Sequence, residues 1–415
     1  MIAKNLVLLS LLLAASPAFL SAETSDWPGY LGPTRDGRTT SWNGELAGAT
    51  TVQFATLWRR PLGSGYSGVA VGGGRAFTMY SDGTSDVLEA MDTTTGRKLW
   101  TQKLAETLKG RGGAADGPTG TPTLAGNVVF ALGPKGQMIA AQASTGKVLW
   151  QRNLVRELGA NVPDWGVSSS PLVVGETVVI LVGGEKHGTV CALAAADGET
   201  VWCAGDTATG YQSPMLLKVG DSEHLVVTSN THLYGLDPES GKSRWSFLYE
   251  PKGGEGSSHP VTVGEDRLLI ETEAGFKLLK IYPATQGVVV KQMWTSTQFK
   301  DSFAVPLAHG DALFGYRGSI FSCLDAGTGE LNWQSRGPGE GEAVLIDDLI
   351  VTWGMDGKLR VVAPDARAYR ELTSHQVLDR GSYTTPAYAN GVLYVRNLEE
   401  IAAVRIAPAS TRVSG

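Results

Sequence analysis

A short motif that ends in Trp recurs along this 415-residue chain, and such internal repetition constrains the fold more than any other feature. Each copy consists of an apolar strand, a turn of the form Asp-x-x-Thr-Gly or a variant of it, and a short strand that closes on Trp. The clearest copies span residues 92–100, 145–150, 197–202, 237–245 and 325–333. Drifted copies end at Trp294 and near Tyr369. The closing residues lie about 36 to 52 positions apart, the span of a four-stranded propeller blade.

The residues of the motif suit a tight turn followed by an outer strand. The leading Asp can accept hydrogen bonds from backbone N–H groups of the turn, and the Gly four residues later can take the left-handed conformation that returns the chain. The Trp then falls on the outer strand, where its flat side chain can pack between neighbouring sheets. We therefore assign a blade-docking role to Trp58, Trp100, Trp150, Trp202, Trp245, Trp294 and Trp333.

A second regular feature, upstream of each motif, allows the blades to be counted. A small or polar pair, often followed by Pro, opens an alternating apolar strand, and Pro is tolerated at the first residue of a strand. Eight such innermost strands begin near Val69, Thr121, Ser170, Ser213, His259, Val305, Ala343 and Thr385. The last copy stops before it reaches a closing Trp, and residues 56–60, which include Trp58, can supply the missing strand.

The sequence thus predicts an all-β fold, an eight-bladed β-propeller of four-stranded antiparallel blades, with the ring closed by an N-terminal strand. No long segment has a 3.6-residue apolar period, which argues against helical layers. Residues 103–108 and 153–158 could each form a short helix. The expected organisation is a signal peptide (1–22), an N-terminal extension (23–55), the propeller (56–407) and a C-terminal tail (408–415).

The N-terminus predicts secretion. Lys4 precedes an apolar stretch over residues 6–15, and small residues follow, with cleavage expected after Ala22 or, as the alternative, after Ala18. That stretch is too short to span a bilayer comfortably, and no Cys near the cleavage site could carry a lipid. A net charge of −6 without basic, aromatic-rich tracts argues against nucleic acid as a partner. We expect a periplasmic or extracellular monomer without a transmembrane anchor.

The chain has three Cys residues. Cys191 and Cys203 flank the turn at residues 197–198 nearly symmetrically, so they could form a disulfide across a hairpin. A shift of one residue in the strand register would place them on opposite faces of the sheet. Cys323 is left over, and we expect it to be buried as a small apolar side chain.

The Ala-x-Asp-x-x-Thr-Gly-x-x-x-Trp unit resembles the Trp-docking repeat of pyrroloquinoline-quinone (PQQ) propellers, from about Trp58 to Ile406. That superfamily includes calcium- and PQQ-dependent alcohol dehydrogenases, a non-catalytic lipoprotein that assists outer-membrane β-barrel assembly, and secreted PQQ-like proteins without an assigned activity. The segment Asp-Trp-Pro-Gly-Tyr at residues 26–30, with residues 32–37, resembles an N-terminal segment of the secreted bacterial members. The resemblance implies the fold and leaves the function open.

A quinoprotein dehydrogenase of this superfamily would be expected to have two adjacent Cys residues over the cofactor and Glu, Asn and Asp ligands for calcium. No two Cys are adjacent here, and no spacing of acidic residues indicates a calcium site. The six His residues lack the paired spacing of a zinc site, and neither a Gly-x-Ser-x-Gly elbow nor a P-loop is present. We therefore predict no metal, no cofactor and no catalytic residue, with PQQ plus calcium as the alternative.

We expect a binding site where the connections between blades rim the central channel. These connections carry aromatic and hydroxyl groups that could stack on a planar or sugar-like ligand, with charged groups beside them. The candidates are Tyr66, Arg111, Asp164, Trp165, Tyr211, Ser258, His259, Phe303 and Tyr383. The alternative is that these residues fill and cap the channel as packed structure.

The main functional hypothesis is a non-catalytic secreted scaffold whose channel-mouth loops bind an envelope protein, a peptide or a carbohydrate. Two alternatives stay open. One is a PQQ-dependent or other redox-cofactor oxidoreductase, and the other is an outer-membrane protein assembly factor.

Overall fold

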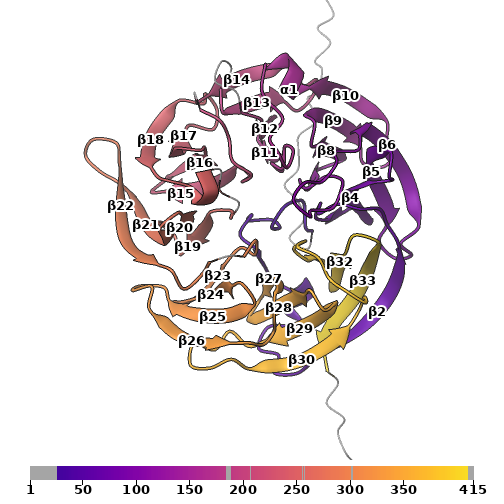
Figure 1. Cartoon of the computed structure of the whole chain (residues 1–415), viewed down its shortest axis with the longest axis vertical. Helices are drawn as coiled ribbons and strands as arrows, with labels where there is room; N and C mark the ends of the chain where they lie inside the picture. Colours follow the sequence, from indigo (N-terminus) through magenta and orange to yellow (C-terminus); the bar gives the residue numbers. More distant parts are fainter. Residues whose placement is uncertain are drawn as a thin grey trace, which may run out of the picture.

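The computed structural model describes residues 26–409 except residues 184–187, 206, 255, 257 and 301. It is a ring of eight sheets around a central axis (Figure 1), which confirms the predicted eight-bladed propeller. The predicted signal peptide lies outside the described residues. Within them, the single α-helix is one turn long (α1, Leu154–Glu157), and no helix is long and apolar enough to cross a membrane.

Each blade is a four-stranded antiparallel sheet whose strands follow one another from the axis outward. Blades 1 to 4 consist, in this order, of β3 (Ala70–Gly72), β4 (Arg75–Ser81), β5 (Ser85–Asp92) and β6 (Lys98–Glu106); β7 (Thr123–Ala125), β8 (Val128–Leu132), β9 (Gln137–Gln142) and β10 (Val148–Asn153); β11 (Leu172–Val174), β12 (Thr177–Leu181), β13 (Val190–Ala194) and β14 (Thr200–Ala204); β15 (Met215–Val219), β16 (Ser222–Thr228), β17 (His232–Leu236) and β18 (Ser243–Leu248).

Blades 5 to 8 repeat the arrangement, and the last of them takes its outermost strand from the N-terminal part of the chain. They consist of β19 (Val261–Val263), β20 (Arg267–Thr272), β21 (Gly275–Pro283) and β22 (Val288–Ser296); β23 (Leu307–His309), β24 (Ala312–Arg317), β25 (Ile320–Asp325) and β26 (Leu331–Ser335); β27 (Gly341–Ile346), β28 (Leu349–Gly354), β29 (Lys358–Val362) and β30 (Glu371–Gln376); β31 (Ala387–Ala389), β32 (Val392–Arg396), β33 (Glu400–Pro408) and β2 (Val52–Pro61).

The ring is closed by antiparallel pairing of β2 with β33, as predicted (Figure 1). Trp58 of β2 lies opposite Ala403 of β33. The junction with blade 1 is held by Arg396, at the end of β32, whose fully buried guanidinium donates to Met79 O (2.7 Å) and Gly63 O (2.9 Å). The two ends of the propeller are thus joined by a strand pair and by one buried cation.

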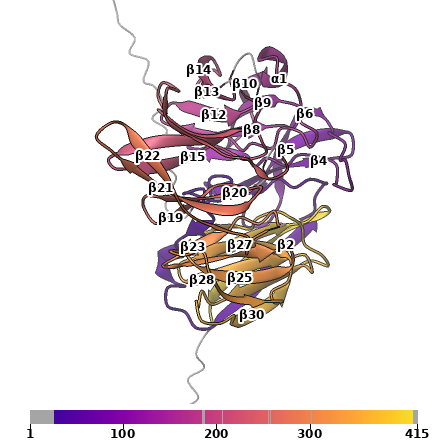
Figure 2. The same ribbon diagram turned by 60° about the vertical axis from the view of Figure 1, so that its left-hand side comes forward.

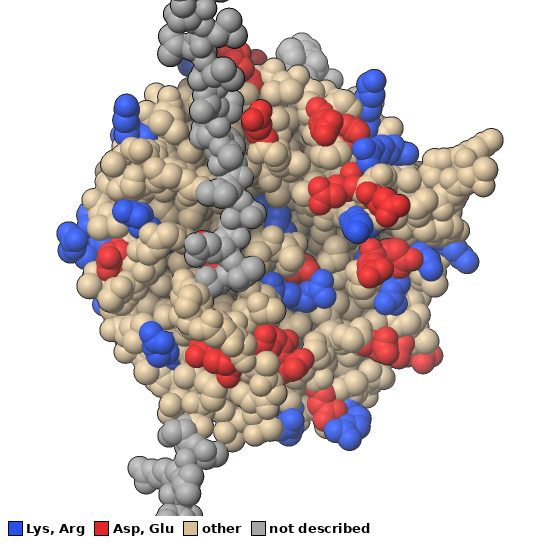
Figure 3. Space-filling model, turned by 180° about the vertical axis from the view of Figure 1, so that it is seen from behind, with Lys and Arg blue, Asp and Glu red and all other residues tan. Residues whose placement is uncertain are grey.

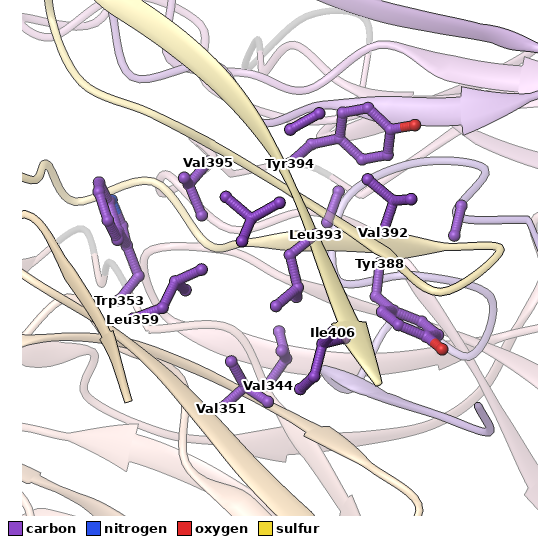
Figure 4. Packing of buried hydrophobic residues seen from close by; sticks show 14 of the residues in the cluster. Val344, Val351, Trp353, Leu359, Tyr388, Val392, Leu393, Tyr394, Val395 and Ile406 are labelled. Atoms are coloured by element: carbon purple, nitrogen blue, oxygen red, sulfur yellow. The ribbon is translucent and has the colours of Figure 1, made fainter. Parts of the chain in front are cut away.

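The core lies between neighbouring sheets, because a single four-stranded sheet cannot bury both of its faces. Figure 4 shows the cluster between blades 7 and 8, where Val351 and Leu359 of blade 7 pack with Leu393 and Ile406 of blade 8. Comparable buried clusters occupy the other boundaries around the ring. Every blade therefore depends on its two neighbours for stability.

The Trp of one blade docks on the turn of the next blade. The indole N–H groups donate to backbone carbonyl oxygens: Trp58 to Thr93 (2.8 Å), Trp100 to Ala143 (3.0 Å), Trp150 to Ala195 (2.9 Å), Trp294 to Ala326 (3.1 Å) and Trp333 to Asp365 (2.8 Å). The turn Gly has a positive φ, and a Cβ on Gly146 would lie 2.6 Å from the Trp100 ring. Gly is thus needed both for the turn and for the ring that lies on it.

The turn Asp has the role expected from the sequence. Asp325 Oδ1 accepts hydrogen bonds from the backbone N–H groups of Gly327 (2.9 Å) and Thr328 (2.8 Å). In the turn after β17, hydrogen bonds from Ser240 and Arg244 lower the pKa of Asp237 to about 2. The Asp side chain thus fixes the turn on which the Trp of the preceding blade docks.

Blade 5 departs from the repeat. Its β21–β22 hairpin lacks the Asp-x-x-Thr-Gly turn and projects from the ring (Figure 2). The Trp of blade 4, Trp245, donates its indole N–H to His224 Nδ1 within its own sheet (3.0 Å) and lies against Gly235. Trp202 lies over Gly241, but its indole nitrogen has no hydrogen-bond partner among the described residues.

The two expected short helices had different outcomes. Residues 154–157 form α1, and the side chain of Asn153 caps its N-terminus by accepting from Arg156 N. A helix at residues 103–108 was wrong, because residues 98–106 form β6. The ladder that β6 makes with β5 uses these backbone groups, and pairing in the sheet overrides the local helical tendency.

Residues 26–40, which we call the plug, lie in the centre of the ring (Figure 1). Trp27 exchanges backbone hydrogen bonds with Val71 of blade 1, and Leu124 N of blade 2 donates to Pro28 O. Further along, β1 (Arg38–Thr39) pairs in parallel with β27 of blade 7. The sequence did not predict that this extension would occupy the channel.

Candidate functional site

A cavity of about 590 Å³, the mouth cavity, lies where the innermost strands begin. Trp27, Tyr30 and Leu31 of the plug form one side of it, and the remaining lining comes from the segments that lead into the innermost strands. A volume of this size suits a small molecule or a few side chains of a larger partner. The plug therefore divides the channel and leaves a pocket at this end.

The structure brings five of the predicted residues together around this cavity: Tyr66, Trp165, Tyr211, Phe303 and Tyr383. Phe303 and Trp165 are 59% and 39% exposed, so both stand at the rim. The rings of Phe303 and Tyr383 meet edge to face with their centroids 5.2 Å apart. Tyr383 also donates its hydroxyl to Glu340 Oε1 (2.8 Å), which orients its ring.

The other predicted residues do not line the mouth cavity. Arg111 and Asp164 form an exposed ion pair (2.6 Å) in the two long connections, so each neutralises the other. Ser258 and His259 are buried. His259 packs edge to face against Tyr30 of the plug, and burial, with Arg35 nearby, lowers its pKa to about 3. His259 therefore supports the plug as a neutral ring.

Hydroxyl groups at the start of the innermost strands link neighbouring blades. Gly68 N donates to Thr121 Oγ1 (3.1 Å), Thr121 N to Ser170 Oγ (2.9 Å), and Ser170 N to Ser213 Oγ (2.9 Å). These side chains line the cavity, yet they already accept a hydrogen bond from the preceding blade. At these positions, the hydroxyl groups therefore have a structural role, in line with the alternative that residues at the channel mouth fill and cap it.

Glu342 is the charged residue of the cavity lining that the sequence interpretation missed. Strand register aligns it with Thr385, because Ile346 of β27 and Ala389 of β31 occupy equivalent positions before their turns. The signal was present: Ala343 stands where most other blades have the Pro that follows this position. Aligning the innermost strands residue by residue would have revealed a carboxylate among the hydroxyl groups.

The carboxyl group of Glu342 is buried, with only 3% of the residue exposed. Thr385 Oγ1 donates to its Oε2 (3.2 Å). Burial raises the pKa of Glu342 to about 7, and the hydrogen bond from Thr385 opposes this shift only in part. Near neutral pH, this carboxyl group can therefore exchange a proton or gain a cationic partner.

The described lining of the mouth cavity contains an acidic side chain and no basic one. Glu342 is the one acidic residue in its described lining, and Lys and Arg are absent from that lining. The described residues contain no group of three His, Cys, Asp or Glu side chains that could hold a metal ion. The remaining polar groups are hydroxyl groups and backbone.

A second cavity, of about 1090 Å³, lies at the other end of the innermost strands. The plug residues Arg35, Asp36 and Arg38 line it, and Asp36 accepts from both Arg38 and Thr262. Seen from behind, the molecule carries interspersed charges of both signs, with basic side chains near the centre (Figure 3). The lining of this second cavity contains both acidic and basic side chains, in contrast to the described lining of the mouth cavity.

Cys191 and Cys203 lie opposite each other in the β13–β14 register and are joined by a disulfide. Neither Cys lines the mouth cavity. Cys323 is buried in β25 and is free. The disulfide therefore joins β13 and β14, the two outer strands of blade 3.

Comparison with known proteins places the chain in a family. The model described as outer membrane protein assembly factor BamB matches residues 53–180 and 83–335. BamB of Yersinia pestis is 25% identical over 294 residues, which are 67% of this chain and 71% of that protein.

Solved structures share the fold. BamB from Moraxella catarrhalis superposes with a TM-score of 0.63 and 18% identity over 85% of this chain and 100% of that chain. A europium-containing methanol dehydrogenase superposes with a TM-score of 0.65 and 13% identity over 93% and 99%. Because an assembly factor and a dehydrogenase share this ring, the fold alone does not assign an activity. The chain belongs to the PQQ-like β-propeller family described as outer membrane protein assembly factor BamB.

Proposed function

We propose that this protein is a non-catalytic scaffold of the cell envelope that takes part in outer-membrane protein assembly. The family match over most of the repeats carries the proposal. The exposed aromatic rim of the mouth cavity supports it, because aromatic side chains such as Trp165 and Phe303 are enriched in protein interfaces. The expected secretion signal is consistent with work outside the cytoplasm.

PQQ with calcium is the weaker candidate. A polyanionic quinone that is removed from water needs cationic partners for its carboxylates, and calcium takes six to eight oxygen ligands. The described lining of the mouth cavity contains one carboxylate and neither Lys nor Arg. The Cys191–Cys203 pair lies on the outer strands of blade 3, away from that cavity. The residues present do not fit this cofactor, and we derive no reaction from it.

Site-specific photo-crosslinking tests the scaffold role. A photoreactive Phe analogue replaces Phe303 or Trp165, and the full-length protein is mixed with an unfolded outer-membrane β-barrel precursor. We expect crosslinks at both rim positions. Leu248, which is 71% exposed on the outer strand β18, is the matched control and should give few.

Two results would count against the role. One is an absence of crosslinks at the rim. The other is equal labelling at Leu248, which would indicate non-specific adhesion of an unfolded chain. A separate addition of PQQ and calcium should leave the melting temperature and the absorbance spectrum unchanged. A shift in either would favour the cofactor alternative.

A further inference from the structure

The buried carboxyl group of Glu342 lacks a cationic partner among the described residues. It lies at the start of β27 with a single hydrogen bond, from Thr385. An ionised carboxylate that is removed from water is costly unless it is paired. Two other buried carboxylates are paired with cations, Glu89 with Arg60 and Asp36 with Arg38, whereas Asp86, within the described part of the chain, accepts only from the backbone N–H of Leu108. Glu342 differs from these three because it has no cationic partner among the described residues and also lines the mouth cavity.

The groups that surround Glu342 cannot neutralise it. Burial raises the pKa of the hydroxyl groups of Tyr30, Tyr316 and Tyr383, and the nearby carboxylate of Glu342 contributes to each shift. The guanidinium of Arg35 lies over the Tyr30 ring, 6.0 Å from its centre. That guanidinium donates to Ser170 O and Pro171 O of blade 3. The protein therefore leaves the negative charge open toward the cavity.

The walls of the cavity suit a cation with an apolar body. Five aromatic residues line the cavity: Tyr66, Trp165, Tyr211, Phe303 and Tyr383. The faces of aromatic rings carry partial negative charge and attract cations. The volume of about 590 Å³ accommodates an ammonium or guanidinium group together with its alkyl or aromatic body. A buried acid surrounded by rings is the arrangement that recognises such groups.

We propose that the mouth cavity binds an organic cation, an ammonium or guanidinium group on an apolar body, with Glu342 as its counter-ion. Two sources share this chemistry: a free amine, and a Lys or Arg side chain of a bound protein segment. The second source rests on the proposed scaffold function, and the first does not. The charge of Glu342 selects the cation, and the rings of the rim hold its apolar part.

Calorimetry with matched probes tests this proposal on the full-length protein at pH 8, above the pKa of Glu342. Phenethylammonium represents a free amine, and phenethyl alcohol is its neutral counterpart. Acetyl-Phe-Lys-amide represents a protein side chain, and acetyl-Phe-norleucine-amide is its neutral counterpart. We expect at least one cationic probe to bind, and to bind roughly tenfold or more tightly than its neutral counterpart.

Variants locate the interaction. Glu342→Gln keeps the shape of the side chain and removes its charge, so it should weaken cation binding roughly tenfold or more and leave the neutral probes unaffected. Glu330→Gln removes an exposed carboxylate in the turn between β25 and β26, outside the described lining of the mouth cavity, and should have a much smaller effect. Trp165→Leu should weaken the cationic probes through loss of a ring. A melting curve for each variant verifies that it is folded.

The outcomes separate the two proposals. Absence of binding by both cations, equal binding by their neutral counterparts, or unchanged binding in Glu342→Gln would overturn the cation site. In those cases, crosslinking of the rim to precursors would still support the scaffold function. Conversely, amine binding that depends on Glu342, without rim crosslinks, would support the site and reject the scaffold function. Binding by the Lys peptide alone would identify a protein side chain as the source.

Discussion

At the scale of residues, the most unusual feature of this protein is its set of buried charged and titratable side chains. Arg35, His259, Glu342 and Arg396 are all nearly fully buried, and all lie around the plug, the mouth cavity or the junction between blades 8 and 1. Burial of charge is costly, so such residues mark positions where a propeller has been adapted beyond its repeat. Two of them predict measurable pH effects.

The carboxyl group of Glu342 should make the protein less stable as pH rises. Its pKa is raised in the fold from 4.5 to about 7, so its contribution to stability is present below pH 4.5 and is lost as pH rises through 7. The loss is about 3 kcal/mol at most. Glu342→Gln should therefore raise the free energy of unfolding at pH 8 and change it little at pH 4. Denaturant titrations at both pH values check this, with Glu330→Gln, at an exposed turn position, as control. Equal effects at the two pH values would contradict it.

His259 should have the opposite effect. Its pKa is lowered in the fold from 6.5 to about 3, so its contribution is present above pH 6.5 and declines as pH falls toward 3. His259→Leu should make the free energy of unfolding less dependent on pH between 6.5 and 4. Denaturant melts across that range measure the slope. A slope identical to that of the unmodified protein would show that His259 does not stay neutral in the fold.

At the scale of elements, the Trp-terminated strand and the turn of the next blade form one unit. The sequence identified both parts, because the turn chemistry of Asp-x-x-Thr-Gly and the closing Trp are local. Which indole N–H groups find a partner depends on the neighbouring blade. Trp100 reaches Ala143 O, whereas Trp202 has no partner among the described residues.

This difference predicts that replacing Trp by Phe lowers the free energy of unfolding by different amounts at positions 100 and 202. Trp100→Phe keeps most of the ring and loses the hydrogen bond to Ala143, so it should cost about 1 kcal/mol more than Trp202→Phe. Trp100→Ala should cost about 3 kcal/mol or more through lost packing. Thermal and denaturant unfolding of the three variants provides the comparison. Equal costs for the two Phe variants would indicate that the indole hydrogen bond adds no net stability.

At the scale of the whole molecule, stability depends on closing the ring. The N-terminal part of the chain acts twice, once as the plug and once as β2 of blade 8. Arg396 joins blade 8 to blade 1 by donating to four acceptors there, namely Gly63 O, Ser67 O, Thr78 Oγ1 (3.1 Å) and Met79 O. An unclosed ring would leave exposed sheet faces at both ends.

Arg396→Met should therefore destabilise the whole protein. It removes the donor for Met79 O and Gly63 O and leaves buried acceptors unpaired, which costs about 3 kcal/mol or more. Arg405→Met, at an exposed position on β33, is the matched control and should be nearly neutral. Hydrogen exchange of β2 and β33 together with a melting curve tests the junction. Unchanged protection in Arg396→Met would show that strand pairing alone closes the ring.

The sequence by itself determined the repeat, the number of blades and the strand that closes the ring, because periodicity, turn residues and Trp positions are local signals. It also named much of the rim, since Tyr66, Trp165 and Phe303 stand at the ends of connections that must converge at a propeller mouth. Only the tertiary structure decided that residues 26–40 plug the channel and that Glu342 faces a cavity without a cation. Both depend on contacts between residues far apart in the chain, and burial of charge is a property of the assembled ring.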